Sequence, residues 1–153
     1  MKTTYVPITG APEVATDSIF KVGQVTDKSG FKFPENAEEP IDLQQAMNDA
    51  LQKALTERGA YGADNSNWTV SVDIVSYAPG NAFARWLMPG AGATKLSVVA
   101  YISDETGLQA AKIPVERSIG FGGAYTIGAW KYVFDEVAKE IADTLIDPKK
   151  RNQ

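Results

Sequence analysis

The chain contains neither cysteine nor histidine. Without cysteine it can form no disulfide framework, no thiolate nucleophile and no cysteine-ligated zinc site. Without histidine it lacks the side chain that most often moves protons near neutral pH and most often binds metals. These absences exclude most familiar hydrolase and metalloenzyme mechanisms, so the sequence predicts no catalytic residue, no cofactor and no metal site.

Long apolar runs and basic stripes are also missing. No stretch approaches the roughly 18 apolar residues that a membrane span requires, and residues 1–10 do not have the basic and then apolar pattern of a signal peptide. With a formal net charge of -4 and scattered basic residues, nucleic acid is not an expected partner. The one basic cluster, Lys149 to Arg151, is expected to be a solvated tail.

What is present fits one folded domain. The 153 residues are 44% hydrophobic and 22% charged, which is close to the average of globular proteins. Residues 1–18 show no sustained periodicity and are expected to form a loose, extended arm. Residues 19–147 are then a single α/β domain, and residues 148–153 form a C-terminal tail.

Two segments have the apolar periodicity of amphipathic helices. The first begins after Asp42, a candidate N-cap with Gln45 three residues on, and it ends at Arg58 with Gly59 as a left-handed cap. Its apolar stripe comprises Leu43, Ala46, Met47, Ala50, Leu51, Ala54 and Leu55. The second stripe comprises Trp130, Val133, Phe134, Val137, Ala138, Ile141, Ala142 and Leu145, and Pro148 ends it. Leu51 and Val137 lie at the stripe centres and are predicted to share one core.

Four segments alternate between apolar and polar residues, as strands with one buried face do. They are residues 19–25, 68–74, 96–102 and 108–119. The last two form a hairpin around Asp104 to Gly107, with Gly107 in a left-handed conformation. Pro114 cannot donate to a ladder, so its strand should lie at an edge or carry a bulge. The predicted fold is α+β, in the order β-α-β-β-β-α, with a small mixed sheet and both amphipathic helices on one face.

The candidate binding residues lie in a long loop from Tyr77 to Thr94. Phe83, Arg85, Trp86 and Met88 are of types enriched in interfaces or apolar anchors, and we predict that they bind a partner. The alternative is that the loop folds over the sheet and buries Trp86. In that case Trp86→Ala should cost about 3–5 kcal/mol of stability. If Trp86 is instead exposed, the same substitution should leave folding intact and weaken binding of the partner.

Three other patterns favour simple structural interpretations. The glycine-rich run at residues 89–94 leads into a strand and has Lys95 where a dinucleotide fingerprint needs glycine. Asp104 and Glu105 could be an acid and base pair, but neighbours in a tight turn point apart and are solvated. The glycosylation sequon at Asn67 is expected to be a chance match.

Residues 85–107 form a wider pattern, in which an arginine and a glycine-rich loop precede a strand that ends in Asp-x-Thr-Gly. This pattern resembles that of uncharacterised bacterial envelope lipoproteins, domains of unknown function. The likeness covers residues 19–147 and extends, in element order, to small α/β modules of envelope-assembly lipoproteins. The resemblance implies a periplasmic protein that acts by binding. It also implies a lipid anchor, whose cysteine is absent from this sequence and would precede Met1 in a full-length form.

The leading hypothesis is therefore a non-enzymatic binding or assembly module of the cell envelope, whose partner is a protein or an envelope component. The membrane would be reached only through a lipid anchor, and the oligomeric state is left open. One alternative is a hydrolase that uses carboxylates alone, such as a glycosidase, whose catalytic carboxyls face each other at about 5–10 Å. The other is a cytoplasmic or phage structural protein.

Overall fold

The computed structural model describes residues 1–37, 39–80, 92–120 and 128–152. Six strands form one mixed sheet in the order β1-β6-β5-β4-β3, with β2 also paired to β6. Strands β3 and β4 are parallel and the other pairs are antiparallel. The strands are β1 Lys2–Thr3, β2 Val6–Pro7, β3 Phe20–Asp27, β4 Trp68–Ala78, β5 Thr94–Ser103 and β6 Gln109–Ile119.

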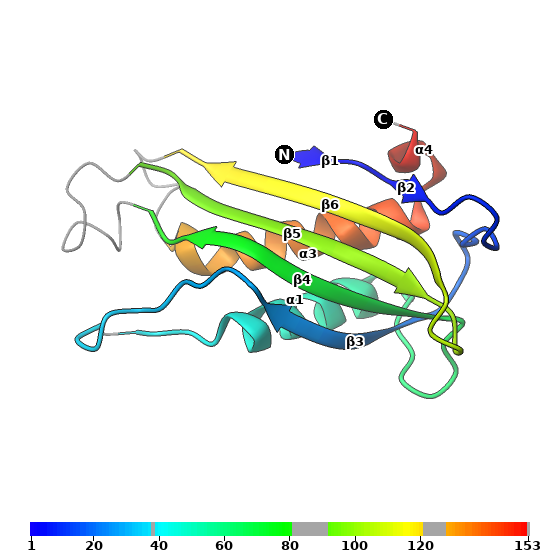
Figure 1. Cartoon of the computed structure of the whole chain (residues 1–153), viewed down its shortest axis with the longest axis horizontal. Coiled ribbons are helices and arrows are strands. Elements are labelled where there is room, and N and C mark those ends of the chain that lie inside the picture. The colour runs from blue at the N-terminus through cyan, green and yellow to red at the C-terminus, as the bar shows by residue number, and fades with distance from the viewer. Residues whose placement is uncertain (38, 81–91, 121–127, 153) are drawn as a thin grey trace.

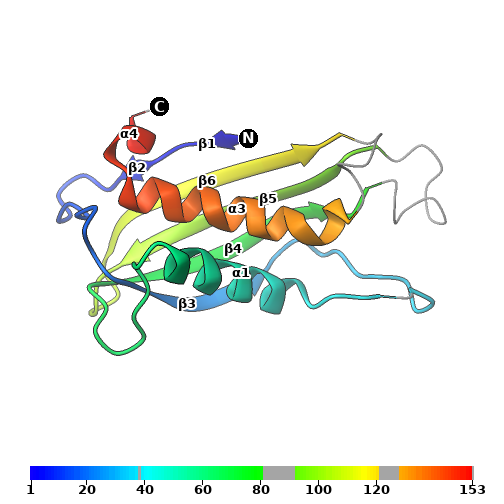
Figure 2. The ribbon, with the colours of Figure 1, turned by 180° about the vertical axis from the view of Figure 1, so that it is seen from behind.

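Two long helices, α1 Leu43–Glu57 and α3 Ala129–Ile146, lie side by side on one face of this sheet (Figures 1 and 2). Their apolar stripes face the sheet, and Leu51 and Val137 are fully buried in one core, as predicted. Helix α1 connects the parallel strands β3 and β4, as a crossover between parallel strands must. The α+β class and the main element order predicted from the sequence are confirmed, with β1, β2 and a short C-terminal helix in addition.

The ends of α1 follow the predicted local chemistry. Asp42 is the N-cap, and its Oδ1 accepts a hydrogen bond of 3.1 Å from the Gln45 backbone N–H. The capping box is only half formed, because the Gln45 amide donates to Asp49 at 2.7 Å instead of reaching back. At the other end Gly59 has a φ of 66°, which is the left-handed cap that was predicted.

The loop predicted between Tyr77 and Thr94 is shorter than expected. Tyr77 still belongs to β4, and Thr94 already belongs to β5. Strand β4 continues beyond a register shift after Ile74, and Tyr77 pairs with Leu96 of β5. The Tyr77 hydroxyl donates a 2.7 Å hydrogen bond to the main-chain carbonyl of Trp130, and burial raises the pKa of Tyr77 far above its ordinary value. Packing against α3 therefore extends the strand beyond the alternating pattern.

The N-terminal arm is not loose, which corrects the prediction. Strands β1 and β2 pair with β6, and the Thr4 backbone N–H donates to the Pro114 carbonyl at 3.1 Å. In an antiparallel strand, the backbone nitrogen and the carbonyl oxygen of one residue point to the same side. The Pro114 nitrogen, which has no hydrogen to donate, therefore also faces the N-terminal arm, in the gap between β1 and β2. Pro114 thus lies on β6, the last long strand of the sheet. On that side β6 pairs only with the two short strands β1 and β2.

The basic C-terminal residues are not a solvated tail either. After Asp147, residues Pro148–Arg151 form helix α4. The Arg151 guanidinium donates to the carbonyls of Thr144 (3.0 Å), Leu145 (2.7 Å) and Val14. It also lies over the ring of Tyr5, 4.6 Å from the centroid. Arg151 therefore joins the end of α3 to the N-terminal segment.

Candidate functional site

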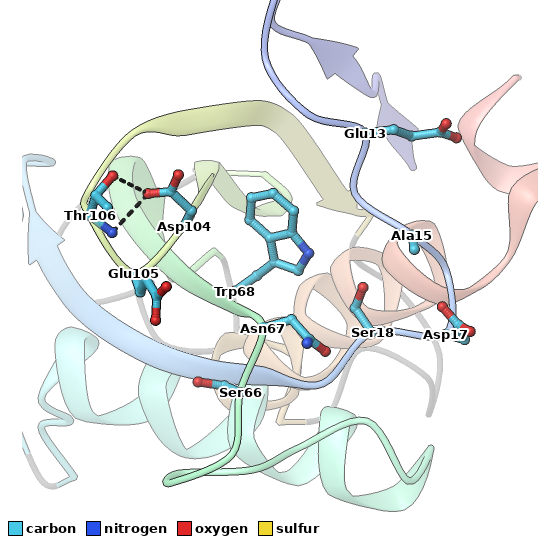
Figure 3. Close-up of a pocket in the computed structure, with 10 residues that line it drawn as sticks. All are labelled: Glu13, Ala15, Asp17, Ser18, Ser66, Asn67, Trp68, Asp104, Glu105 and Thr106. Carbon is cyan, nitrogen blue, oxygen red and sulfur yellow. Dashed lines mark hydrogen bonds between the residues drawn. The ribbon is translucent and has the colours of Figure 1, made fainter.

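The four residues predicted to bind a partner, Phe83, Arg85, Trp86 and Met88, lie outside the described residues. Their role stays a prediction. The described parts of the chain nevertheless form another candidate site, a hollow of about 650 Å³ at one end of the sheet (Figure 3). Three segments that are distant in sequence line it, namely the entry to β3, the start of β4 and the β5–β6 turn.

The sheet topology explains why these segments meet. In the parallel pair, Phe20 of β3 lies opposite Trp68 of β4, so both strands begin at the same end. In the antiparallel pair, Thr69 of β4 lies opposite Ser103 of β5, so β5 ends there. The residues just before β3 and just after β5 must therefore flank the start of β4. This places Trp68 between the two in Figure 3.

The β5–β6 turn supplies Asp104, Glu105 and Thr106. Asp104 Oδ1 accepts hydrogen bonds from the Thr106 hydroxyl (2.6 Å), the Thr106 N–H (2.8 Å) and the Leu108 N–H (3.0 Å). The Thr106 hydroxyl is the main reason that the pKa of Asp104 is lowered. Gly107 closes the turn with a φ of 90°, as predicted. The interpretation of this segment as a turn is correct, and Asp104 is an ionised carboxylate at neutral pH.

The opposite wall is held in place by Asn67. The Asn67 side-chain oxygen accepts a 2.8 Å hydrogen bond from the Ile19 backbone N–H. The Asn67 backbone N–H donates a second hydrogen bond, also of 2.8 Å, to the Ile19 carbonyl. This pair of bonds fixes Ser18 beside Trp68. Ser18 is only 7% exposed, and Figure 3 shows its hydroxyl directed into the hollow, on the side of the Trp68 indole nitrogen.

In the sequence, Asp104 and Glu105 were considered as a pair and Asn67 as part of a sequon, whereas Ser18 and Trp68 were not predicted as site residues. The signal that could have found the site is the parallel pairing of β3 with β4, which brings the two strand starts together. Alternating polarity identifies a strand but does not say which strand it pairs with.

The lining of the hollow is acidic. Glu13, Asp17, Asp104 and Glu105 line it, together with polar and apolar side chains and without any lysine or arginine. Among the described residues, no three carboxylates converge closely enough to hold a metal ion. Within the same residues, no helix is both long and apolar enough to cross a membrane.

Comparison with solved structures shows that the fold is shared by distant proteins. The PelC dodecamer from Paraburkholderia phytofirmans has 12% sequence identity and a TM-score of 0.58, and the match covers 94% of this chain and 97% of that one. A DUF330-family protein from Xanthomonas campestris has 13% identity and a TM-score of 0.60, over 96% and 94% of the two chains. A protein from Caulobacter crescentus described as a lipoprotein matches with 14% identity and a TM-score of 0.39, over 82% and 84%.

Among curated proteins no match is found. A family model does match, and it covers residues 18–123, from the end of the N-terminal arm through β6. Because this is well over half of the chain, the protein belongs to the family described as a domain of unknown function, DUF4410.

Proposed function

We propose that this protein is a non-enzymatic assembly module of the bacterial cell envelope that works as a homo-oligomer. The observation that supports this most is the agreement with a subunit of the PelC dodecamer over nearly the whole length of both chains. A fold that matches such a subunit over 94% of this chain supports a role in assembly.

The sheet supplies a surface for such contacts. Helices α1 and α3 cover one face, and no helix in the described part of the chain covers the other, which we call the open face (Figure 1). On the open face Val99 lies between Asp73 of β4 and Pro114 of β6 in the strand register. Val75 is 49% exposed on β4. Apolar side chains among charged ones are typical of non-obligate protein interfaces.

The envelope location rests on the resemblance of residues 85–107 to envelope lipoproteins. The test is fractionation of the full-length protein from its native cells, with periplasmic and cytoplasmic marker enzymes as controls. Recovery with the membrane or periplasmic markers is expected. Recovery with the cytoplasmic marker would contradict the location and favour the cytoplasmic or phage alternative.

The hydrolase alternative would need one protonated carboxyl in the acidic hollow. Asp104 is unsuited to that role, because its hydrogen bonds to Thr106 and Leu108 lower its pKa and keep it ionised. Asp104 is therefore not a candidate acid for this alternative.

Light scattering coupled to size exclusion tests the oligomer. We expect a mass several times the 16.5 kDa of the chain, and we expect Val75→Asp to reduce it. Leu108→Asp is the matched control, because Leu108 is 57% exposed in the β5–β6 turn, away from the open face. A mass of one chain at about 100 μM, where even weak subunit contacts would be populated, would contradict the proposal.

A further inference from the structure

We propose that the hollow beside Trp68 binds the ammonium group of an organic cation, between the indole ring and the carboxylates of the β3 entry and the β5–β6 turn. This inference concerns a ligand site on each chain. It is independent of whether the chains assemble.

The first argument is uncompensated charge. Asp17, Asp104 and Glu105 line the hollow, and none of them forms an ion pair with any described lysine or arginine. Glu13 also lines it, but Glu13 borders a second hollow that contains Arg151, so the argument does not depend on Glu13. A concave surface with charges of one sign concentrates the opposite ion. The hollow therefore attracts cations from solution.

The second argument is the hydroxyl of Ser18. Ser18 is more than nine-tenths buried, and its hydroxyl has no hydrogen-bond partner among the described residues. It lines the hollow and points into it (Figure 3). The hydroxyl is reached from the hollow, because the fully enclosed side-chain atom without a partner in the described residues is Thr3 Oγ1, so a donor bound in the hollow can hydrogen-bond to Ser18 in place of water. An ammonium group has three donors and no acceptor, so it can serve the hydroxyl and a carboxylate together.

The third argument is size and the aromatic wall. The hollow measures about 650 Å³, and its carboxylates do not converge on one point in the described structure. A single metal ion would be too small for that arrangement, whereas an alkyl amine can extend across it. The half-buried indole of Trp68 supplies an apolar surface for the alkyl chain and a π face for the cation. Lysine side chains and free polyamines both carry this group.

The experiment uses cadaverine, which has the alkylammonium group of both sources. The probe signal is the indole N–H of Trp68 in 15N-tryptophan-labelled protein, assigned by its loss in Trp68→Phe. We expect a saturable shift with cadaverine at low salt, and none with 1-pentanol, which lacks the charge. A shift that does not saturate, or an equal shift with pentanol, would overturn the proposal.

Charge-neutral variants separate the site from general attraction to an acidic protein. Asp17→Asn and Glu105→Gln should each weaken the dissociation constant by about threefold or more, as the loss of one partly exposed charge pair predicts. Glu35→Gln is the matched control, because Glu35 is exposed in the segment after β3, at the opposite end of the sheet, and its substitution changes the net charge equally. Equal weakening by all three variants would show non-specific attraction and refute the site.

Ser18→Ala gives a readout that a purely structural role would not produce. Without ligand the variant should be about as stable as the wild type, because the hydroxyl makes no hydrogen bond within the described residues. Its affinity for cadaverine should nevertheless fall. A lysine-containing peptide and spermidine, titrated in parallel, then distinguish a protein side chain from a free polyamine as the source of the amine. Unchanged affinity in Ser18→Ala would contradict the proposed geometry.

Discussion

Arg151 should stabilise the whole fold, although only two residues follow it in the sequence. Its guanidinium donates to carbonyls of Thr144 and Leu145 in the last turn of α3 and to the carbonyl of Val14. The last carbonyls of a helix have no partner within the helix, so Arg151 satisfies groups that would otherwise need water. The contact with the Tyr5 ring adds a cation–π term.

The expected size of the effect follows from these contacts. A hydrogen bond to a charged group contributes about 1.5–3 kcal/mol, but the three bonds share one partly exposed side chain and do not add fully. We therefore expect Arg151→Ala to cost about 2–4 kcal/mol. For a chain of this length that corresponds to a fall in Tm of roughly 4–16 °C. Arg151→Lys should recover only part of this, because lysine cannot span three carbonyls with a planar fork.

Urea denaturation followed by circular dichroism measures the change, with Lys149→Ala as the control. Lys149 is exposed in the same short helix, and its removal changes the net charge equally. Hydrogen exchange gives a local test, because Arg151→Ala should speed exchange at the amides of Thr4 and Ile8, which tie the N-terminal arm to β6. If Arg151→Ala unfolds at the same urea concentration as Lys149→Ala, the reasoning is wrong.

Three further predictions concern the core, the hairpin turn and the pH dependence. Leu51→Ala should cost about 2–5 kcal/mol in urea denaturation, whereas Leu108→Ala, at a 57% exposed position, should change stability by less than about 0.5 kcal/mol. Gly107→Val should lower Tm through backbone strain of about 1–2 kcal/mol, because φ is 90° there and no atom lies within 4 Å of an added Cβ. Gly120→Val, also in open space but without a positive φ, should not, and equal melting of the two variants would contradict this. Burial raises the pKa of Tyr77 above its ordinary 10.0, so the folded protein holds this proton more tightly and loses stability as the pH rises above 10. Tyr77→Phe should show a shallower fall in Tm between pH 9 and pH 11, and an identical slope would contradict this assignment.

Part of the candidate site was accessible from the sequence. The turn at Asp104 to Gly107 was predicted from residues that are close in the chain, and the structure confirms it. The hollow itself was not predicted, because it depends on which strands are neighbours. The proposed role of Phe83, Arg85, Trp86 and Met88 stays a prediction, since they lie outside the described residues. The predicted membership of a family of unknown function is confirmed by the family match.

The sequence by itself determined the elements that depend on near neighbours. Helix caps at Asp42 and Gly59, the buried stripes of α1 and α3 and the turn at Gly107 all involve residues within a few positions of one another, whose conformations follow from periodicity and backbone sterics.

Only the tertiary structure decided the contacts between distant segments. The parallel pairing of β3 with β4, the N-terminal arm on β6 and the bond from Arg151 to Val14 join residues that are many positions apart. Local pattern carries little information about them, because each forms only when the packed core has brought its two partners together.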